Sequence, residues 1–334
     1  MSKKRWLALL AVTVLFILSS VFNFSATTTT TTSNWEELFK TDDQKWVERT
    51  LREGDRKEKI VVLDVNGVIQ DQEDTSVLFS SVGYRHRTFL SMLEHAAEDP
   101  DVEGIIIRVN SPGGGVVESA EIYDKIRSIQ EEYFKKVYVS MGSMAASGGY
   151  YIAAPADKIF ANTSTITGSL GVIMQSYNVA ELAEKLGIEE QTIKSGEFKD
   201  IMSPTRGMTE EERAILQSII DDAYDEFVHV IVEGRELSEE KVRSIADGRI
   251  YSGSQAKQLD LIDEIGSYEE TVDALIEDLG LGNLQVIRYE TSVGINDLLQ
   301  LSAQKLTMNQ GDLLGLQQLL RQTNSPTLMY LYTK

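Results

Sequence analysis

Three short apolar runs, each ending in small or polar residues, constrain the fold of this chain most strongly. Two of them, residues 60–69 and 104–109, are rich in Ile and Val, and the third covers residues 137–141. Such runs are typical of strands that are buried on both faces of a parallel sheet. Helical patterns at residues 88–97 and 116–132 separate the runs. This alternation predicts an α/β layered fold with mostly parallel strands.

The rest of the chain continues the alternation and shows no internal repeat. Residues 35–59 carry apolar side chains at helical spacing, which predicts a charged helical lead-in. Thr209 followed by acidic residues predicts the start of a long amphipathic helix over residues 209–235. Further strands are expected at residues 158–161, 171–174, 190–193 and 285–289, and further helices at residues 177–186, 237–251, 254–261 and 268–279.

The N-terminus has the pattern of a membrane anchor. Three cations among the first five residues precede residues 6–22, which carry no charge. That length is near the lower limit for crossing a bilayer and also fits a signal peptide. Cleavage after Ala26 would place the large side chain of Phe24 at the −3 position, so an uncleaved anchor is favoured. The cationic flank stays in the cytoplasm, which puts the rest of the chain outside it.

Composition excludes several classes of protein. The chain has 52 acidic against 32 basic residues and a formal net charge of −20, which argues against nucleic acid as a partner. It has no cysteine, which excludes disulfides, cysteine nucleophiles and thiolate metal sites. The acidic residues show no spacing that indicates a metal site, so neither a metal nor another cofactor is expected.

The third apolar run leads into a candidate nucleophile, Ser147, which is followed by Gly148 and Gly149. A serine at a strand-to-helix junction lies near the positive end of a helix dipole, where developing negative charge is favoured. Its small neighbours let a peptide backbone approach closely. The alternative, from these residues alone, is a tightly packed helix start without chemistry.

A serine nucleophile needs a base to take its proton. The three histidines, none in a glycine-rich context, are expected to be structural or surface residues: His86, His95 and His229. A lysine can serve as the base if burial removes its charge. Two lysines of one polar turn compete, Lys194 and Lys199, and the apolar neighbours of Lys199 favour it slightly.

Backbone amides for an oxyanion are expected from two places. The glycine run from Gly113 to Gly115 and the residue after the serine, Gly148, leave amides without covering side chains. A phosphate-binding loop or a plain turn is the alternative for the glycine run. The run does not match the spacing of a P-loop or of a dinucleotide-binding fingerprint.

Four motifs in order resemble one family. They are Val109-Asn-Ser-Pro-Gly-Gly-Gly115, Met144-Ala-Ala-Ser-Gly-Gly-Tyr150, Thr167-Gly-Ser-Leu-Gly-Val172 and Ser195-Gly-Glu-Phe-Lys199. Together they resemble the signal peptide peptidase A (protease IV) family in its short, single-repeat bacterial form, over residues 60–275. The one departure is Leu170, where the family more often has isoleucine.

The resemblance implies a serine endopeptidase with a Clp protease/crotonase-like fold and a Ser-Lys dyad. Ser147 would be the nucleophile and Lys199 the general base, while Ser169 would hold the lysine amine. The oxyanion amides would come from the turn at Gly113 and Gly114, and from Gly148. The substrates would be remnant signal peptides and other apolar peptides, cut at the bacterial cell membrane by a single-pass protein through an acyl-enzyme.

The expected organisation is an anchor over residues 1–26, a Thr-rich linker over 27–34, a protease domain over 35–282 and a C-terminal extension over 283–334. Longer family members carry two copies of the unit, so this chain is expected to form a homo-oligomeric ring with sites shared between protomers. A self-contained site is the alternative.

The uncharged tail over residues 325–332 resembles a peptide substrate and is a candidate occupant of a groove, or else a packing tail. Two rival functions remain. One is a hydratase or thioesterase on the same fold, and the other is a catalytically silent membrane-anchored scaffold.

Overall fold

The computed structural model describes residues 46–71, 84–291 and 328–332. The expected anchor over residues 1–26 and linker over residues 27–34 lie outside the described residues. Within the described ranges, no helix is both long and apolar enough to cross a membrane.

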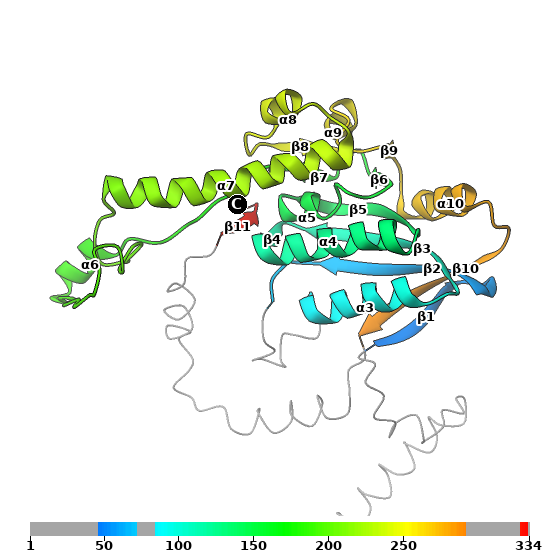
Figure 1. Ribbon diagram of the computed structural model, residues 1–334, viewed down its shortest axis with the longest axis horizontal. Coiled ribbons are helices and arrows are strands. Elements are labelled where there is room, and N and C mark those ends of the chain that lie inside the picture. The colour runs from blue at the N-terminus through cyan, green and yellow to red at the C-terminus, as the bar shows by residue number, and fades with distance from the viewer. Residues whose placement is uncertain (1–45, 72–83, 292–327, 333–334) are drawn as a thin grey trace, which may run out of the picture. The chain divides into compact units, whose positions relative to one another are not determined.

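A mostly parallel sheet forms the centre of the fold (Figure 1). Its main path runs in the order β1 (Trp46–Arg52), β10 (Leu284–Thr291), β2 (Asp55–Asn66), β3 (Val102–Ser111), β5 (Lys136–Ala146), β6 (Lys158–Ala161) and β9 (Glu264–Ile265). Every neighbouring pair on this path is parallel except β1 with β10. Two short strands, β7 (Ile166–Gly168) and β8 (Ile250–Ser252), extend the sheet beyond the end of β5. The expected α/β layered fold with mostly parallel strands is confirmed.

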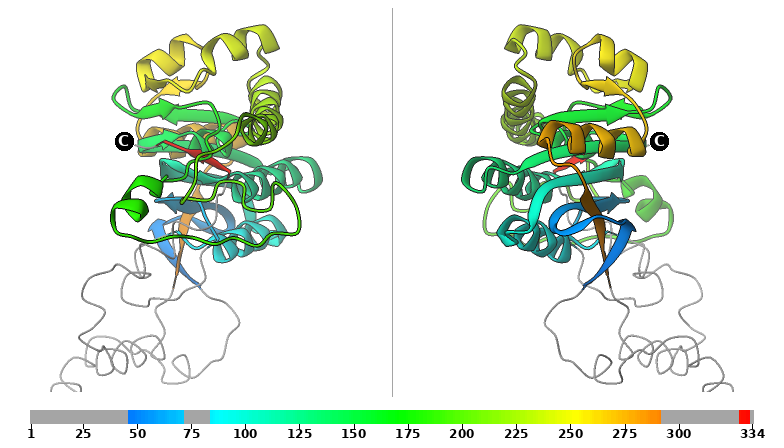
Figure 2. Two further views of the ribbon diagram at one scale, coloured as in Figure 1. Left: turned by 90° about the vertical axis from the view of Figure 1, so that its left-hand side faces the viewer. Right: turned by 90° about the vertical axis from the view of Figure 1, so that its right-hand side faces the viewer.

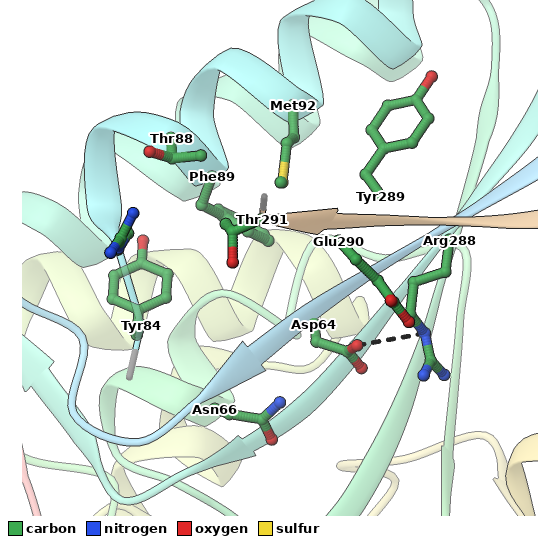
Figure 3. Close-up of a pocket in the computed structure, with 11 residues that line it drawn as sticks. Asp64, Asn66, Tyr84, Thr88, Phe89, Met92, Arg288, Tyr289, Glu290 and Thr291 are labelled. Carbon is green, nitrogen blue, oxygen red and sulfur yellow. Dashed lines mark ion pairs between the residues drawn. The ribbon is translucent and has the colours of Figure 1, made fainter. Parts of the chain in front are cut away.

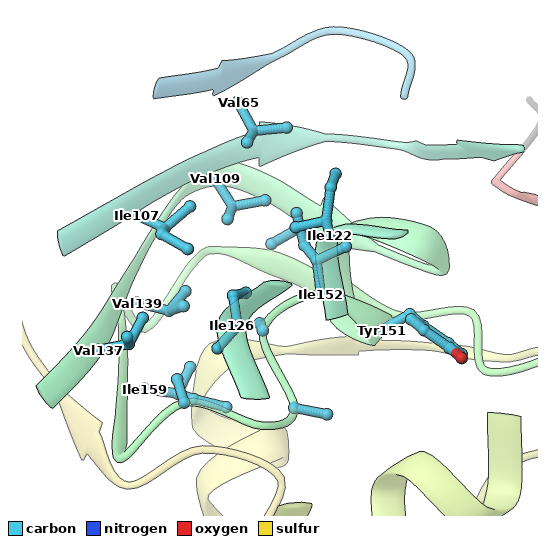
Figure 4. Packing of buried hydrophobic residues seen from close by; sticks show 14 of the residues in the cluster. Val65, Ile107, Val109, Ile122, Ile126, Val137, Val139, Tyr151, Ile152 and Ile159 are labelled. Carbon is cyan, nitrogen blue, oxygen red and sulfur yellow. The ribbon is translucent and has the colours of Figure 1, made fainter. Parts of the chain in front are cut away.

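Alternating side chains of the central strands fill two separate cores. In β3, Ile105 and Ile107 belong to one cluster of buried residues, while Ile106 belongs to the other. Each of these side chains is fully buried, and burying one of this size stabilises the fold by about 1.5–3 kcal/mol. Figure 4 shows part of the larger cluster, in which Ile122 and Ile126 pack over the strand residues. The sheet is therefore covered on both faces, as its sequence pattern requires.

Helices cover each face of the sheet. Figure 2 shows α3 (His86–Glu98) and α4 (Val116–Glu132) side by side on the face of the larger cluster. Helix α10 (Tyr268–Leu279) supplies Val272 and Leu275 to the smaller cluster on the other face. The remaining helices of the described residues are α5 (Gly148–Tyr151), α6 (Ala180–Lys185), α7 (Glu210–Arg235), α8 (Glu239–Ile245) and α9 (Gly253–Gln258).

The expected helical lead-in is wrong over its described part. Residues 46–59 form β1 and the start of β2 instead of a helix. Trp46 pairs with Thr291, so β1 is held by β10, a strand that lies far along the chain. The local spacing of apolar residues matches a helix, but long-range pairing decides the structure. Strand β10 belongs to the segment expected as a C-terminal extension, and it lies inside the sheet between β1 and β2.

The long helix α7 begins where the sequence predicts. Thr209 accepts from the Glu212 amide, and the Glu212 side chain accepts from the Thr209 amide, which completes a capping box. Figure 1 shows α6 and the N-terminal half of α7 extending away from the sheet. No residue from 171 to 211 is buried, and the strand expected at 190–193 is absent. The helix expected at 237–251 is also wrong in part, because α8 ends at Ile245 and β8 follows.

Candidate active site

Ser147 lies at the junction between β5 and α5, as the sequence predicts. Its backbone adopts φ +54° and ψ −118°, a conformation that costs a side chain about 1–3 kcal/mol. The surrounding backbone holds it in place: the Ser147 amide donates to the Gly168 carbonyl at 2.7 Å. The Ser147 carbonyl accepts from the amides of Tyr150 and Tyr151, both at 2.9 Å. Strain at one serine, fixed from both sides, is typical of a functional position.

The hydroxyl of Ser147 is buried and has no hydrogen-bond partner among the residues that the structure describes. The residue is only 1% exposed, and its Oγ is among the few buried side-chain polar atoms of the described chain that lack a partner. Most buried hydroxyls in folded proteins are hydrogen-bonded, so an orphan needs an explanation. A partner supplied from outside this chain is one such explanation.

The glycine turn brings two backbone amides close to one point. Gly113 has φ +100°, and a Cβ added there would lie 2.0 Å from the Tyr330 carbonyl oxygen and 2.6 Å from the Gly148 nitrogen. A Cβ on Gly148 would lie 3.1 Å from both the Gly114 nitrogen and the same oxygen. The amides of Gly114 and Gly148 therefore lie near one carbonyl oxygen. The Gly113 amide donates instead to Ser111 Oγ at 3.0 Å, so this turn holds itself in shape.

The C-terminal tail lies in this region as a strand. Strand β11 (Met329–Leu331) pairs antiparallel with β4 (Gly113–Gly115), with Tyr330 opposite Gly114. On its other side Met329 forms a bridge to Ile173. An extended segment between two backbone edges is how many proteins bind a peptide. The described part of the expected tail thus shows where an extended peptide lies relative to the glycine turn.

The side chain of Tyr330, the central residue of β11, lies in an aromatic pocket. The Tyr330 ring is fully buried, with its centroid 4.9 Å from that of Tyr151 and 4.7 Å from that of Phe227. Its hydroxyl donates to the Ala223 carbonyl at 2.9 Å. The sequence motifs do not predict this pocket, because Phe227 and Ala223 come from α7, far from the motif of Ser147.

Ser169 follows Gly168, whose carbonyl accepts the hydrogen bond from the Ser147 amide. It has φ +53°, and its amide donates to the Arg249 carbonyl at 2.7 Å. It lines a cleft of about 410 Å³ together with Ile173, Tyr224 and Leu331, next to β11. The structure thus brings Ser147, Ser169 and the glycine turn to one end of the parallel sheet.

Lys199 is not brought to Ser147 within the chain. Its side chain is exposed and makes no hydrogen bond or ion pair with any described residue. Phe198, expected to shield it from water, is itself 41% exposed. Lys194, the competing lysine, donates to the Glu197 carbonyl at 2.8 Å and to Asp200 Oδ1 at 2.7 Å, so its amine is already used within the turn.

None of the histidines contacts Ser147. His86 is buried between the Tyr84 hydroxyl at 2.6 Å and Glu121 at 2.5 Å. His95 packs its ring against Trp46, and His229 lies on the surface of α7. These positions confirm the structural and surface roles expected for the histidines.

A second cleft, of about 230 Å³, lies beside β2 and β10 (Figure 3). Asp64 and Arg288 pair across it at 3.3 Å, and burial raises the pKa of Asp64. This cleft contains neither Ser147 nor the glycine turn. Within the described parts of the chain, no three His, Asp or Glu side chains gather closely enough to hold a metal ion.

Known proteins are similar to this chain in sequence. A protein of Enterococcus faecium named signal peptide peptidase SppA is 41% identical over 296 residues, which cover 87% of this chain and 85% of that protein. The chain belongs to the signal peptide peptidase A family. Residues 130–282 match peptidase family S49. Protease 4 of Haemophilus influenzae is 36% identical over 215 residues, or 64% of this chain and 34% of that protein.

Membership of this family makes the protein a serine peptidase. The peptidase S49 match begins before β5 and ends after α10, so it includes Ser147, Ser169 and Lys199. The glycine turn and the β11 tail lie outside that match, and the structure adds them to the surroundings of Ser147.

Proposed function

We propose that the chain is a membrane-anchored endopeptidase that cuts remnant signal peptides through an acyl-enzyme on Ser147. One observation carries this proposal: the orphan hydroxyl of Ser147 lies beside a glycine turn on which β11 pairs as an extended peptide. A peptide bound in this way would present a backbone carbonyl to the amides of Gly114 and Gly148, where the Tyr330 carbonyl now lies.

The proposed reaction has two halves. Ser147 Oγ attacks the carbonyl carbon of the substrate, and its proton passes to the neutral amine of Lys199. The amides of Gly114 and Gly148 stabilise the oxyanion, and Gly113 supplies the positive φ that the turn needs. The C–N bond then breaks, and the leaving amine takes the proton from the lysine. Water, deprotonated by the same lysine, then attacks the ester carbonyl, the bond to Ser147 Oγ breaks, and the lysine returns the proton to that oxygen.

We assign Lys199 to the Ser147 of a neighbouring protomer. Lys199 is exposed, and the segment around it carries an unusual number of exposed apolar side chains. Packing of this segment against a neighbour would bury them, exclude water from the lysine and favour its neutral form. These side chains are Tyr177, Val179, Leu182, Leu186, Ile188, Ile193 and Phe198.

In this arrangement Ser169, which lies close to Ser147 in the fold, would accept a hydrogen bond from the amine of the incoming Lys199 and so orient it. A head-to-tail contact of this kind repeats from one protomer to the next, and in the proposed assembly the rotation between protomers closes it into a ring.

The substrate class follows from the groove. It holds an extended backbone between β4 and Ile173, and it buries an apolar side chain between Tyr151 and Phe227. Apolar peptides in extended form suit it, and the cores of cleaved signal peptides have that composition. The anchor over residues 1–26 would hold the enzyme at the bacterial cell membrane where such remnants remain, with the catalytic part outside the cytoplasm.

The test is covalent labelling of the full-length protein with a fluorophosphonate probe, followed by mass spectrometry of its peptides. The label should be on Ser147 alone and should be lost in Lys199→Ala. Lys57→Ala, which removes an exposed lysine of β2, serves as the matched control and should label normally. Labelling of another serine, or unchanged labelling in Lys199→Ala, would contradict the proposal.

A further inference from the structure

Among the described residues, the turn that carries Lys199 has no hydrophobic core to hold it, because no residue from 171 to 211 is buried. Lys199 contributes only a backbone hydrogen bond, from its amide to the Gly196 carbonyl at 3.2 Å. A general base must nevertheless be placed to within a fraction of an ångström, because a misplacement of about 1 Å costs on the order of 100-fold in rate. Within one chain, the position of Lys199 is therefore set by its polar neighbours.

Arg206 forms a bidentate ion pair with Asp200, the residue after Lys199. Its Nε donates to Asp200 Oδ2 at 2.9 Å, and its Nη2 donates to Asp200 Oδ1 at 2.8 Å, the two-pronged geometry that gives guanidinium pairs their directionality. The same Nη2 also donates to the Asp200 backbone carbonyl at 3.0 Å. Both the side chain and the backbone of Asp200 are thus held by one guanidinium.

The same guanidinium reaches the start of α7. Arg206 Nη1 donates to Glu212 Oε2 at 2.8 Å, and Nη2 contacts Glu212 Oε1. The Glu212 side chain is only 2% exposed and also completes the capping box with Thr209. Arg206 therefore links the residue after Lys199 to the capped first turn of a 26-residue helix.

The charges make this link persistent. Hydrogen bonds from Arg206 and Lys194 hold the pKa of Asp200 well below its usual range. Arg206, together with the Thr209 amide, lowers the pKa of Glu212 to about 2. Both carboxylates are therefore ionised at neutral pH. An isolated surface ion pair would contribute little, but this network has two carboxylates on one planar fork.

We propose that Arg206 is the positioning residue of the general base: it fixes the turn of Lys199 to α7 through Asp200 and Glu212. The proposal rests on the proposed function, in which Lys199 acts on Ser147 of a neighbour. Loss of Arg206 would leave Lys199 present but misplaced, and would leave the peptide groove of the other protomer untouched.

Steady-state kinetics on assembled, full-length protein measures this directly. Arg206→Gln should lower kcat 10- to 100-fold and change KM less than 2-fold, because β4 and Ile173 bind the peptide elsewhere. Arg206→Lys keeps one charge without the fork and should recover part of the loss. Arg243→Gln is the matched control, since Arg243 also bridges two carboxylates, Asp225 and Glu239, and it should stay within 2-fold of wild type.

Mixed assemblies of two variants test the positioning role of Arg206 separately from the proposal that the site is shared between protomers. Arg206→Gln mixed with Ser147→Ala should regain activity, because some sites then combine an intact Ser147 with an intact lysine turn. Arg206→Gln mixed with Lys199→Ala should not. A kcat within 2-fold of wild type, or recovery with Lys199→Ala, would overturn the positioning role.

Two further outcomes are decided in the same way. If Ser147→Ala mixed with Lys199→Ala regains nothing, the shared site fails, and the kcat of Arg206→Gln alone still decides the role of Arg206. If Arg206→Gln does not assemble, Arg206→Lys in intact assemblies decides it, and wild-type kcat there would overturn the role.

Discussion

The surroundings of Ser147 and of Lys199 are built in opposite ways. Ser147 follows a central strand, is 1% exposed, and its backbone is fixed by hydrogen bonds on both sides. Lys199 lies in a stretch, residues 171–211, in which no residue is buried. Its turn is held by ion pairs around Arg206 and not by packing. One half of the proposed site is formed by the core of the chain, and the other half extends away from it.

The difference explains two observations together. We call the surroundings of Ser147 the serine side and residues 171–211 around Lys199 the lysine side. Among the described residues, the Ser147 hydroxyl on the serine side and the Lys199 amine on the lysine side each lack a partner. Each half lacks what the other half offers, but one chain does not bring them together. This account predicts that changes on the serine side act on chemistry or on folding, while changes on the lysine side act on chemistry or on assembly.

The largest expected effect comes from removing either reactive group. Ser147→Ala and Lys199→Arg should each lower peptide turnover by about 10⁴-fold or more, the second because a guanidinium does not give up its proton. Neither change should lower the thermal midpoint of unfolding by more than a few degrees. Turnover of Lys199→Arg above one per cent of wild type would show that Lys199 is not the base.

A matched pair of isoleucines sharpens the contrast between core and surface. Ile107 is fully buried in the central sheet, so Ile107→Ala should lower the free energy of unfolding by about 2–5 kcal/mol. Ile193 is fully exposed, so Ile193→Ala should change it by less than about 0.5 kcal/mol. Denaturant unfolding gives both values. Ile193→Ala should instead weaken the assembly, as measured by sedimentation, and an unchanged assembly would count against the proposed interface.

As the pH falls, the start of α7 and the turn of Lys199 should lose stability before the core around β5 does. The pKa of Glu212 falls from its ordinary value of 4.5 to about 2 on folding. A lowered pKa stabilises the fold fully above pH 4.5, and that stabilisation is lost as the pH falls toward 2. The protection factors of the amides at the start of α7, which remove the intrinsic pH dependence of exchange, should therefore fall between pH 4.5 and 2.5, while those of β5 stay high. Glu212→Gln should remove most of this pH dependence; if it persists in full there, Asp200 or another group is responsible.

The smallest effect concerns the tail. If β11 competes with substrates for the groove, deleting residues 325–334 should raise the turnover of a short peptide by a few-fold at low substrate concentration. Tyr330 also fills the pocket between Tyr151 and Phe227, so the deletion opens that pocket. Unchanged or lost turnover would mean that the tail is a structural strand of the fold and not a competitor.

Local sequence predicted the serine side well. The apolar run before Ser147 and the small residues after it specify β5 and α5, because burial and a close backbone approach leave few alternatives. The capping box at Thr209 is equally local, and α7 begins as predicted. Features that depend on contacts between distant parts of the chain were missed. Strand β1 pairs with β10, and a segment whose own spacing suggests a helix becomes a strand.

The lysine side was predicted only as a motif. The sequence predicted that Lys199 lies in a polar turn. It did not predict that the apolar side chains near Lys199 are exposed within one chain. The roles of Asp200, Arg206 and Glu212 were missed, although alternating charges after the motif are a signal of an ion-pair network. In the same way, the motif did not show that the Gly113 amide is used by Ser111.

The most direct test of a site divided between two protomers is complementation. Ser147→Ala and Lys199→Ala, each inactive alone, are co-expressed with different affinity tags, and mixed assemblies are isolated through both tags. A shared site predicts that part of the wild-type peptide turnover returns, because some interfaces then pair an intact Ser147 with an intact Lys199. Isolated mixed assemblies without any turnover would contradict the account and show that each chain completes its own site.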